Sequence, residues 1–268
     1  MLSGGFFKEA RRLDINVFLI VCPLVFLAGL VDSIAGGGGL IALPAYLMAG
    51  IPPQFALGTN KLSSIGGTTI ASIRYYRNKY VDLIICLPSI AAALIGSALG
   101  SSLALYVNEK VIQWILLIVI PVTAFYIFRK KELDNNNSNF SRRKTIILSV
   151  IISFFIGGYD GFSGPGTGTF LILLYNGAAK IDARISAGNA KLVNFSSNLS
   201  ALILFLINGK VLIPLGLIAA AFNMLGGYIG SGLVIHKGTR IIRYTILIIL
   251  LLIFVKLIWD MISQNLSG

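Results

Sequence analysis

Long runs of apolar residues with few charges between them constrain this chain more than any other feature. Of its 268 residues, 56% are hydrophobic and 12% are charged, and the mean hydropathy is +0.86. A soluble domain carries about 25% charged residues, so this chain has too few charges to cover a water-exposed surface. Disorder is excluded as well, because unfolded chains combine low hydrophobicity with high charge. The composition predicts an all-α polytopic membrane protein.

The apolar runs form two series separated by one polar stretch. A helix needs about 20 residues to cross the bilayer core; several runs reach this length, and two are much shorter. The polar stretch, residues 129–144, reads RKKELDNNNSNFSRRK and is predicted to be a cytoplasmic linker. The runs before it cover residues 15–35, 40–51, 56–73, 81–107 and 111–128, and those after it cover 145–159, 170–178, 184–207, 211–235 and 241–262.

The second series repeats the first. Lys61 falls on Lys191 at a shift of 130 residues, and Asp32 falls on Asp160 at a shift of 128. Matched apolar residues are common by chance, but matched charges in apolar segments are not. We therefore expect two homologous repeats of about five helical segments each, with glycine-broken short helices, as recurs in secondary transporters. The expected domains are a first transmembrane repeat at 1–128, the linker at 129–144 and a second transmembrane repeat at 145–268.

Basic loops predict the orientation of the repeats. The formal net charge of +12 would suggest nucleic-acid binding in a soluble protein, but here the basic residues gather in loops. Residues 74–79, the linker and residues 236–243 are expected at the cytoplasmic face of a bacterial inner or plasma membrane. Five segments per repeat place all three on one side and make the repeats inverted, the arrangement that we favour. Four crossings per repeat would make them parallel, and whether the short runs cross or re-enter stays open.

Two glycine-rich stretches precede the short apolar runs. Non-helical backbone survives at membrane depth only where protein buries it or water fills a cavity. If each short run is a half-helix that begins at its glycines, the N–H groups and the dipole of its first turn favour an anion. Alternatively, the glycines permit close packing or a tight turn. The candidate anion-binding residues here are Gly37, Gly38 and Gly39 in the first stretch and Ser163, Gly166, Thr167 and Gly168 in the second.

Lys61 and Lys191 lie inside otherwise apolar runs. A lysine at the membrane centre costs about 3 kcal/mol unless it is paired or hydrated, so each is a functional candidate, unless it snorkels to an interface. Amides and hydroxyls beside an ammonium suit a small oxyanion, which needs several donors, although they also serve helix–helix hydrogen bonding. The polar candidates near the lysines are Thr59, Asn60 and Ser63 in the first half and Asn189, Asn194 and Asn198 in the second.

Asp32 and Asp160 are the matched acids, and each lies shortly before a glycine-rich stretch. Three roles fit this position. Each aspartate carries a proton that couples transport to the proton gradient, serves as counter-ion to Lys61 and Lys191, or caps the helix that follows. We favour capping or pairing over proton transport.

Two small-residue motifs predict close helix contacts. Gly96-x-x-x-Gly100 and Gly226-x-x-x-Gly230 present faces on which another helix can approach closely. We assign both motifs to packing, either within the bundle or between copies of the chain in a homo-oligomer.

The motif pattern also resembles a known family. Gly36-Gly37-Gly38-Gly39 is followed by Leu43-Pro44, then by Gly58-Thr59-Asn60-Lys61, and residues 161–168 read GFSGPGTG. Over nearly the whole chain outside the linker, this resembles the TauE/SafE sulfite exporter family of membrane permeases. The resemblance implies a duplicated permease that moves sulfur-containing anions such as sulfite, sulfoacetate or other organosulfonates, usually outward. Asn189-Ala190 replaces Thr59-Asn60 in the second half, so the halves are not expected to bind symmetrically.

The resulting hypothesis is a secondary transporter that holds its anion between two repeats and alternates access by rocking one against the other. The expected partners are the small anion and the lipid bilayer, without nucleic acid. The sequence has no His pair, metal-ligand cluster or nucleophile–base motif, so we expect no enzyme, metal or cofactor. The alternative is a transporter or channel for another small solute: a carboxylate, another oxyanion or a cation.

Overall fold

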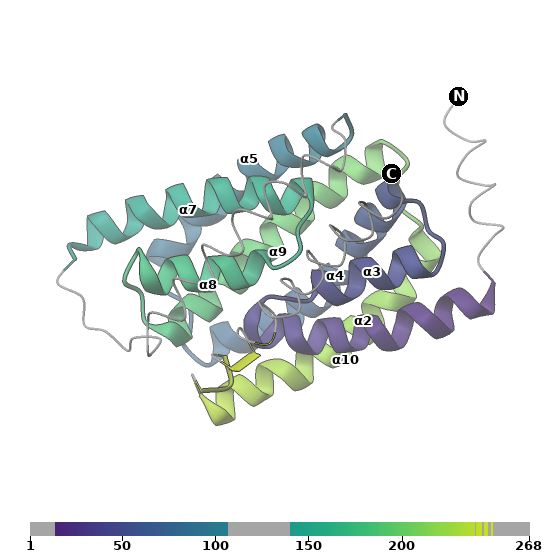
Figure 1. Cartoon of the computed structure of the whole chain (residues 1–268). Coiled ribbons are helices and arrows are strands. Elements are labelled where there is room, and N and C mark those ends of the chain that lie inside the picture. Colours follow the sequence, from purple (N-terminus) through teal and green to yellow (C-terminus); the bar gives the residue numbers. More distant parts are fainter. Residues whose placement is uncertain (1–13, 107–139, 239, 243, 246–247, 249–268) are drawn as a thin grey trace, which may run out of the picture.

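The chain folds into a bundle of α-helices (Figure 1). The computed structural model describes residues 14–106, 140–238, 240–242, 244–245 and 248, and no strand occurs in these ranges. The all-α prediction is confirmed for this part of the chain. Its helices are α2 (Ile15–Ala35), α3 (Gly39–Met48), α4 (Pro53–Arg77), α5 (Leu83–Ala104), α7 (Arg142–Phe162), α8 (Thr167–Gly177), α9 (Ala183–Ile207) and α10 (Ile213–Lys237).

Five of these helices, α2, α5, α7, α9 and α10, are long and apolar enough to cross a membrane. Large apolar side chains on them are exposed, among them Leu19, Ile95, Phe155 and Ile203. Contiguous apolar surface of this kind suits contact with lipid. The run predicted at 111–128, and most of the run at 241–262, lie outside the described residues.

Helix α4 is as long as α9 and α10, at 25 residues, but carries too many polar residues to be among the five. It packs on α9 and α10, which cover its polar face. Thr59, Asn60, Lys61 and Ser63 are all buried there. Because protein rather than lipid surrounds these side chains, a polar helix is tolerated at the centre of the bundle.

Helix α7 begins three residues before the predicted apolar run at 145–159. The expected linker extended to Lys144, but α7 already begins at Arg142. Ser141 caps this helix, since its hydroxyl accepts a hydrogen bond from the Lys144 N–H at 3.4 Å. A serine cap therefore starts the helix before its apolar segment begins.

Both small-residue motifs pack within one chain. Helix α5 lies along α7 and α10 lies along α2. A Cβ on Gly100 would overlap the Gly158 carbonyl oxygen, and a Cβ on Gly226 would overlap the carbonyl oxygen of Phe26. The prediction that these glycines serve close packing is confirmed, and their partners are helices of the same chain.

Helices α4 and α9 are antiparallel neighbours at the centre. Gly58, near the start of α4, lies against the Lys210 carbonyl just beyond α9, and Gly188, near the start of α9, lies against the Tyr80 carbonyl just beyond α4. Each contact is too close for a Cβ. The two helices therefore begin at opposite ends of the bundle.

The described basic stretches gather at one of these ends, which we call the basic end. Arg142 Nη2 lies 3.5 Å from Asp82 Oδ1, which joins the end of the predicted linker to the segment after α4. Arg184 lies over the Tyr80 ring at 5.7 Å and against Gly238 beyond α10. This clustering matches the prediction that these loops share one side.

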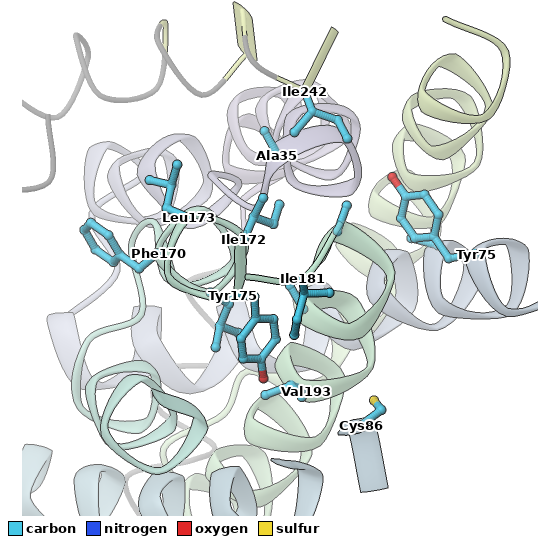
Figure 2. Close-up of a cluster of buried hydrophobic side chains, with 14 of the residues drawn as sticks. Ala35, Tyr75, Cys86, Phe170, Ile172, Leu173, Tyr175, Ile181, Val193 and Ile242 are labelled. Atoms are coloured by element: carbon cyan, nitrogen blue, oxygen red, sulfur yellow. The ribbon is translucent and has the colours of Figure 1, made fainter. Parts of the chain in front are cut away.

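The two short helices are too short to cross the bilayer core, and they differ in burial: α8 is buried along nearly its whole length, whereas α3 buries Ala42, Ala45 and Tyr46 and exposes Leu47 and Met48. α3 has 10 residues and α8 has 11, which gives each a length of about 15 Å, half of the core thickness. α8 lies within the largest apolar cluster, where Phe170, Ile172, Leu173 and Tyr175 pack against side chains of neighbouring helices (Figure 2). Other parts of the protein, not lipid, thus surround α8 over nearly its whole surface.

Candidate functional site

The two glycine-rich stretches, far apart in the sequence, meet inside the bundle. A Cβ on Gly36 would overlap the backbone of Gly168 and Thr169, and a Cβ on Gly39 would lie 3.2 Å from Pro165 Cα. The Thr169 hydroxyl also donates to the Ala35 carbonyl oxygen at 2.7 Å. We call this contact between residues 36–39 and 164–168 the glycine crossing.

Both short helices start at the glycine crossing and leave it in opposite directions. Positive φ angles of +83° at Gly36, +90° at Gly164 and +81° at Gly166 let the chain break there, which L side chains rarely allow. α3 leads to the start of α4 and α8 leads to the start of α9, at opposite ends of the bundle. The positive ends of both helix dipoles therefore lie at the crossing.

Lys61 and Asp160 form a buried ion pair beside the glycine crossing. Lys61 Nζ lies 3.0 Å from Asp160 Oδ1 and donates to the Asp160 carbonyl oxygen at 2.6 Å, and only 2% and 3% of the two side chains are exposed. Two hydroxyls also donate hydrogen bonds to the Asp160 carboxylate: Thr167 to Oδ1 at 2.8 Å and Ser197 to Oδ2 at 2.6 Å. A Cβ on Gly164 would lie 3.0 Å from Lys61 Nζ, so this ammonium lies against the crossing itself.

Lys191 and Asp32 form the second pair, with a less complete environment. Lys191 Nζ lies 2.8 Å from Asp32 Oδ2; the lysine side chain is 0% exposed and the aspartate side chain is 15% exposed. The Gly38 N–H donates to Asp32 Oδ1 at 3.4 Å, in the break before α3. Each pair thus joins a lysine from one half of the chain to an aspartate from the other.

The burial of both lysines excludes snorkelling to an interface. Each ammonium is compensated by a carboxylate, as a charge in a low-dielectric interior requires. The site therefore contains two ammonium groups, two carboxylates and two helix N-termini within one water-poor region. An anion that enters it competes with a carboxylate for a lysine that is already desolvated.

Two predicted site residues contact helix starts instead of the ion pairs. Thr59 Oγ1 accepts a hydrogen bond from the Leu212 N–H at 3.0 Å, at the start of α10. Asn189 Oδ1 accepts from the Asp82 N–H at 3.0 Å, at the start of α5. These contacts satisfy donors that a helix N-terminus leaves open. Among the described residues, the Asn189 Nδ2 group is buried without a partner.

The remaining predicted amides and hydroxyls bond mostly to neighbours along their own helices. Asn198 Nδ2 donates to Asn194 Oδ1 at 3.2 Å, and the Ser63 hydroxyl donates to the Asn60 carbonyl oxygen at 3.0 Å. Ser63 also accepts from the Tyr46 hydroxyl at 2.9 Å, which ties α4 to α3. Gly37, Gly38 and Gly168 are buried at the glycine crossing and Gly39 is half-buried there, while Ser163 is buried just before it.

Several contacts of the site were not predicted. Ser197 holds the Asp160 carboxylate, Tyr75 donates to the Ser33 carbonyl oxygen at 2.7 Å, and Tyr159 donates to the Pro165 carbonyl oxygen at 2.6 Å. Ser197 lies six residues after Lys191 in the same polar run, which is the one signal the sequence offers. The tyrosines carry no such signal, because aromatic residues are frequent in apolar helices.

A hollow of about 650 Å³ opens at the basic end. It is lined by Arg184, Lys237, Gly238, Arg240, Ile241 and Tyr244. Among the described lining residues, three side chains are cationic and none is a carboxylate, a charge distribution that favours anions over cations. In the part of the chain that the structure describes, no group of three or more His, Cys, Asp or Glu residues is arranged to hold a metal ion.

The proteins to which this chain is similar are membrane transporters. The family model "Sulfite exporter TauE/SafE" matches residues 21–257. A "Probable membrane transporter protein" of Haemophilus influenzae is 34% identical over 249 residues, which cover 92% of this chain and 97% of the relative. The "Probable membrane transporter protein YfcA" of Escherichia coli K12 is 35% identical over 258 residues, which cover 93% of this chain and 96% of the relative.

A plant relative matches a shorter part. The "Sulfite exporter TauE/SafE family protein 6" of Arabidopsis thaliana is 33% identical over 110 residues, or 39% of this chain. No solved structure matches. With membrane transporters as relatives over nearly its full length and five apolar candidate spans, the chain is a multi-pass membrane protein. Because the family model covers most of its residues, this chain belongs to the TauE/SafE sulfite exporter family.

Proposed function

We propose that this protein is a secondary transporter of small sulfur-containing anions, sulfite or an organosulfonate, which bind at the glycine crossing. The observation that carries the proposal is the pair of buried lysines, Lys61 and Lys191, each held by an aspartate of the other half. Oxyanions need several donors and a positive partner. The ammonium groups and the two helix N-termini supply both in one place.

The proposal includes two inverted repeats. The contacts of one half recur in the other at the same shifts: Lys61 meets Asp160 as Lys191 meets Asp32. The antiparallel contact of α4 with α9 supports inversion over a parallel arrangement. Repeats of this kind bind substrate at their interface near the membrane midplane.

Alternating access follows from the same contacts. Both ion pairs tie one half of the chain to the other, so an anion that takes a lysine from its aspartate loosens one tie between the halves. Rocking of one half against the other then exposes the crossing to opposite sides. The ligand shifts the equilibrium only by its differential affinity for the two states.

Flux through proteoliposomes tests the site. Lys191→Ala is expected to reduce labelled sulfite flux at least about tenfold, because a charge-assisted contact of about 1.5 kcal/mol to the anion is lost. Lys61→Ala is expected to reduce flux at least as much, because it leaves the Asp160 carboxylate buried without its cation and removes one tie between the halves. Lys210→Ala is the matched control, since Lys210 lies beyond α9 with its ammonium 5.2 Å from the Phe55 ring and not in either pair. If both site variants transport like the control, the site assignment is wrong.

Thermal stabilisation in detergent tests the class of solute. Sulfite and small sulfonates are expected to raise the unfolding temperature, because ligands that bind the folded state stabilise it. Carboxylates, other oxyanions and cations form the rest of the panel. Stabilisation by cations alone would overturn the anion proposal.

The basic hollow gives a second prediction on transport. Lys237→Glu and Arg240→Glu are expected to raise KM for the anion several-fold at low salt with little change in kcat, because steering affects encounter more than the bound state. The difference should shrink at high ionic strength, where exposed charges are screened. The control is Lys210→Glu, which makes the same charge change at the opposite end of the bundle. When the anion is supplied from the basic end, this variant should leave KM unchanged. A change in KM that is the same at low and high ionic strength would contradict electrostatic steering of the anion.

A further inference from the structure

The two ion pairs are chemically unequal. Asp160 is 3% exposed and its carboxylate accepts from the Thr167 and Ser197 hydroxyls in addition to Lys61. Asp32 is 15% exposed, and besides Lys191 its carboxylate accepts only the 3.4 Å bond from the Gly38 N–H in the described structure. One carboxylate is fully coordinated and closed off, whereas the other is more accessible and has spare acceptor capacity.

The difference between the two ion pairs follows from residues that differ between the two halves of the sequence. Ser197 corresponds to Gly67 at the shift of 130, and Thr167 corresponds to Gly39 at the shift of 128. Both hydroxyl donors of the second half are therefore glycines in the first. The space at Gly67 is filled by Asn223, whose Oδ1 a Cβ there would overlap, so no donor for Asp32 can come from that position.

We infer that the Lys191–Asp32 pair is the exchanging part of the site, where one proton binds Asp32 as the anion takes its place on Lys191, while the Lys61–Asp160 pair stays closed. This inference rests on the proposed function and names its coupling ion. Transport is then anion–proton symport, with a direction set by the sum of the two gradients.

Charge balance explains why a proton must accompany the anion. If a monoanion replaced the carboxylate without a proton, the site would gain one buried negative charge, which is costly in a low-dielectric interior. A proton from water on Asp32 Oδ2 neutralises the carboxylate, and the Lys191 ammonium keeps its three protons and donates to an anion oxygen instead. The charge of the site is the same before and after the exchange.

The same exchange at Asp160 is disfavoured by its contacts. The Lys61 and Asp160 side chains are only 2% and 3% exposed, so an anion and a proton reach this pair only if the surrounding packing opens. Protonation would also weaken the bonds from the Thr167 and Ser197 hydroxyls, which would turn to the Gly164 and Asn194 carbonyl oxygens. The Lys61–Asp160 pair therefore acts as the permanent tie between the halves.

The other charged and titratable groups around Asp32 are accounted for. From α4, the Tyr75 hydroxyl donates to the neighbouring Ser33 carbonyl oxygen, and Arg74 lies over the Tyr228 ring of α10 at 4.1 Å. Tyr46 of α3 and Tyr175 of α8 are hydrogen-bonded to serine hydroxyls. Lys191 of α9 is therefore the charged group in direct contact with Asp32 in the described structure.

The decisive experiment uses methanesulfonate, which stays anionic near neutral pH, so any coupled proton belongs to the protein. In proteoliposomes with clamped membrane potential and equal anion concentrations, an interior more alkaline by about one unit should drive up to about tenfold accumulation of label. Purified protein in weak buffer should take up about one proton per anion bound. Exchange of label without accumulation under the pH gradient would overturn the inference and leave the proposed function intact.

Variants locate the proton. Asp32→Asn should lose the pH-driven accumulation, with a ratio near one, and its anion exchange should no longer respond to pH. Asp14→Asn is the matched control, because Asp14 is an exposed carboxylate that precedes the same helix. Accumulation that persists in Asp32→Asn would overturn the assignment. If no anion is exchanged and none raises the unfolding temperature, the proposed function itself is rejected. If Asp32→Asn does not fold, the proton uptake of the unaltered protein on anion binding tests the inference instead.

Discussion

Lys61→Met is expected to destabilise the protein by about 3–5 kcal/mol, because it leaves the Asp160 carboxylate buried without its cation. Total stabilities are of the order of 5–15 kcal/mol, so much of the variant should be unfolded or aggregated after extraction. Asp160→Asn added to Lys61→Met removes the orphaned charge and should recover most of the loss. Monodispersity in mild detergent and the midpoint of thermal unfolding measure the effect.

The second pair supplies the matched comparison. Lys191→Met leaves the Asp32 carboxylate without its cation, but this side chain is 15% exposed, so the loss of stability should be clearly smaller than in Lys61→Met. Asp32→Asn added to it should recover correspondingly less. Equal losses from Lys61→Met and Lys191→Met, or no recovery in the first double variant, would contradict the view that the two pairs differ.

Most helices were predictable because lipid and a buried core impose the same demand for apolar residues. The run predicted at Ile15–Ala35 is the observed α2, and the predicted short runs overlap α3 and α8 to within a few residues. The start of α7 was missed because Ser141 caps the helix ahead of its apolar segment. Hydropathy locates the part of a helix that must be apolar, whereas capping residues determine where the helix begins.

The site was only partly predictable. The matched positions of Lys61 and Lys191 and of Asp32 and Asp160 singled out four residues, but a sequence shift cannot tell which lysine meets which aspartate. The crosswise pairing follows from the packing of α4 against α9, which no periodicity reports.

Tertiary packing also decided the roles of the smaller residues. Thr59 and Asn189 bond to the N-termini of helices more than 100 residues away in the sequence, a partner that only the folded chain supplies. Gly36 belongs to the first glycine-rich stretch, yet the candidates were its neighbours Gly37, Gly38 and Gly39, and Gly36 makes the closest contact with the other stretch. Residue type indicated a break in the helix, and the close approach of two backbones had no signature of its own.

Gly36→Ala is expected to cost several kcal/mol, whereas Gly50→Ala should cost about 1–2 kcal/mol. Both glycines have a left-handed conformation, with φ of +83° and +77°, so both substitutions carry the same backbone strain. No atom lies within 4 Å of a Cβ on Gly50, but a Cβ on Gly36 overlaps the backbone of Gly168 and Thr169. Thermal unfolding in detergent gives both values, and their difference isolates the contact.

Gly168→Ala tests the same contact without left-handed strain. Gly168 lies in the first turn of α8, where alanine would ordinarily stabilise a helix by about 1 kcal/mol. Its Cβ would lie 2.5 Å from Gly36 Cα, and backbone cannot rotate away as a side chain can. A destabilised Gly168→Ala with lower anion flux is therefore the expected result. A stabilised variant would mean that the two glycine-rich stretches separate readily, and the ion pairs would then lose the rigid crossing that places them.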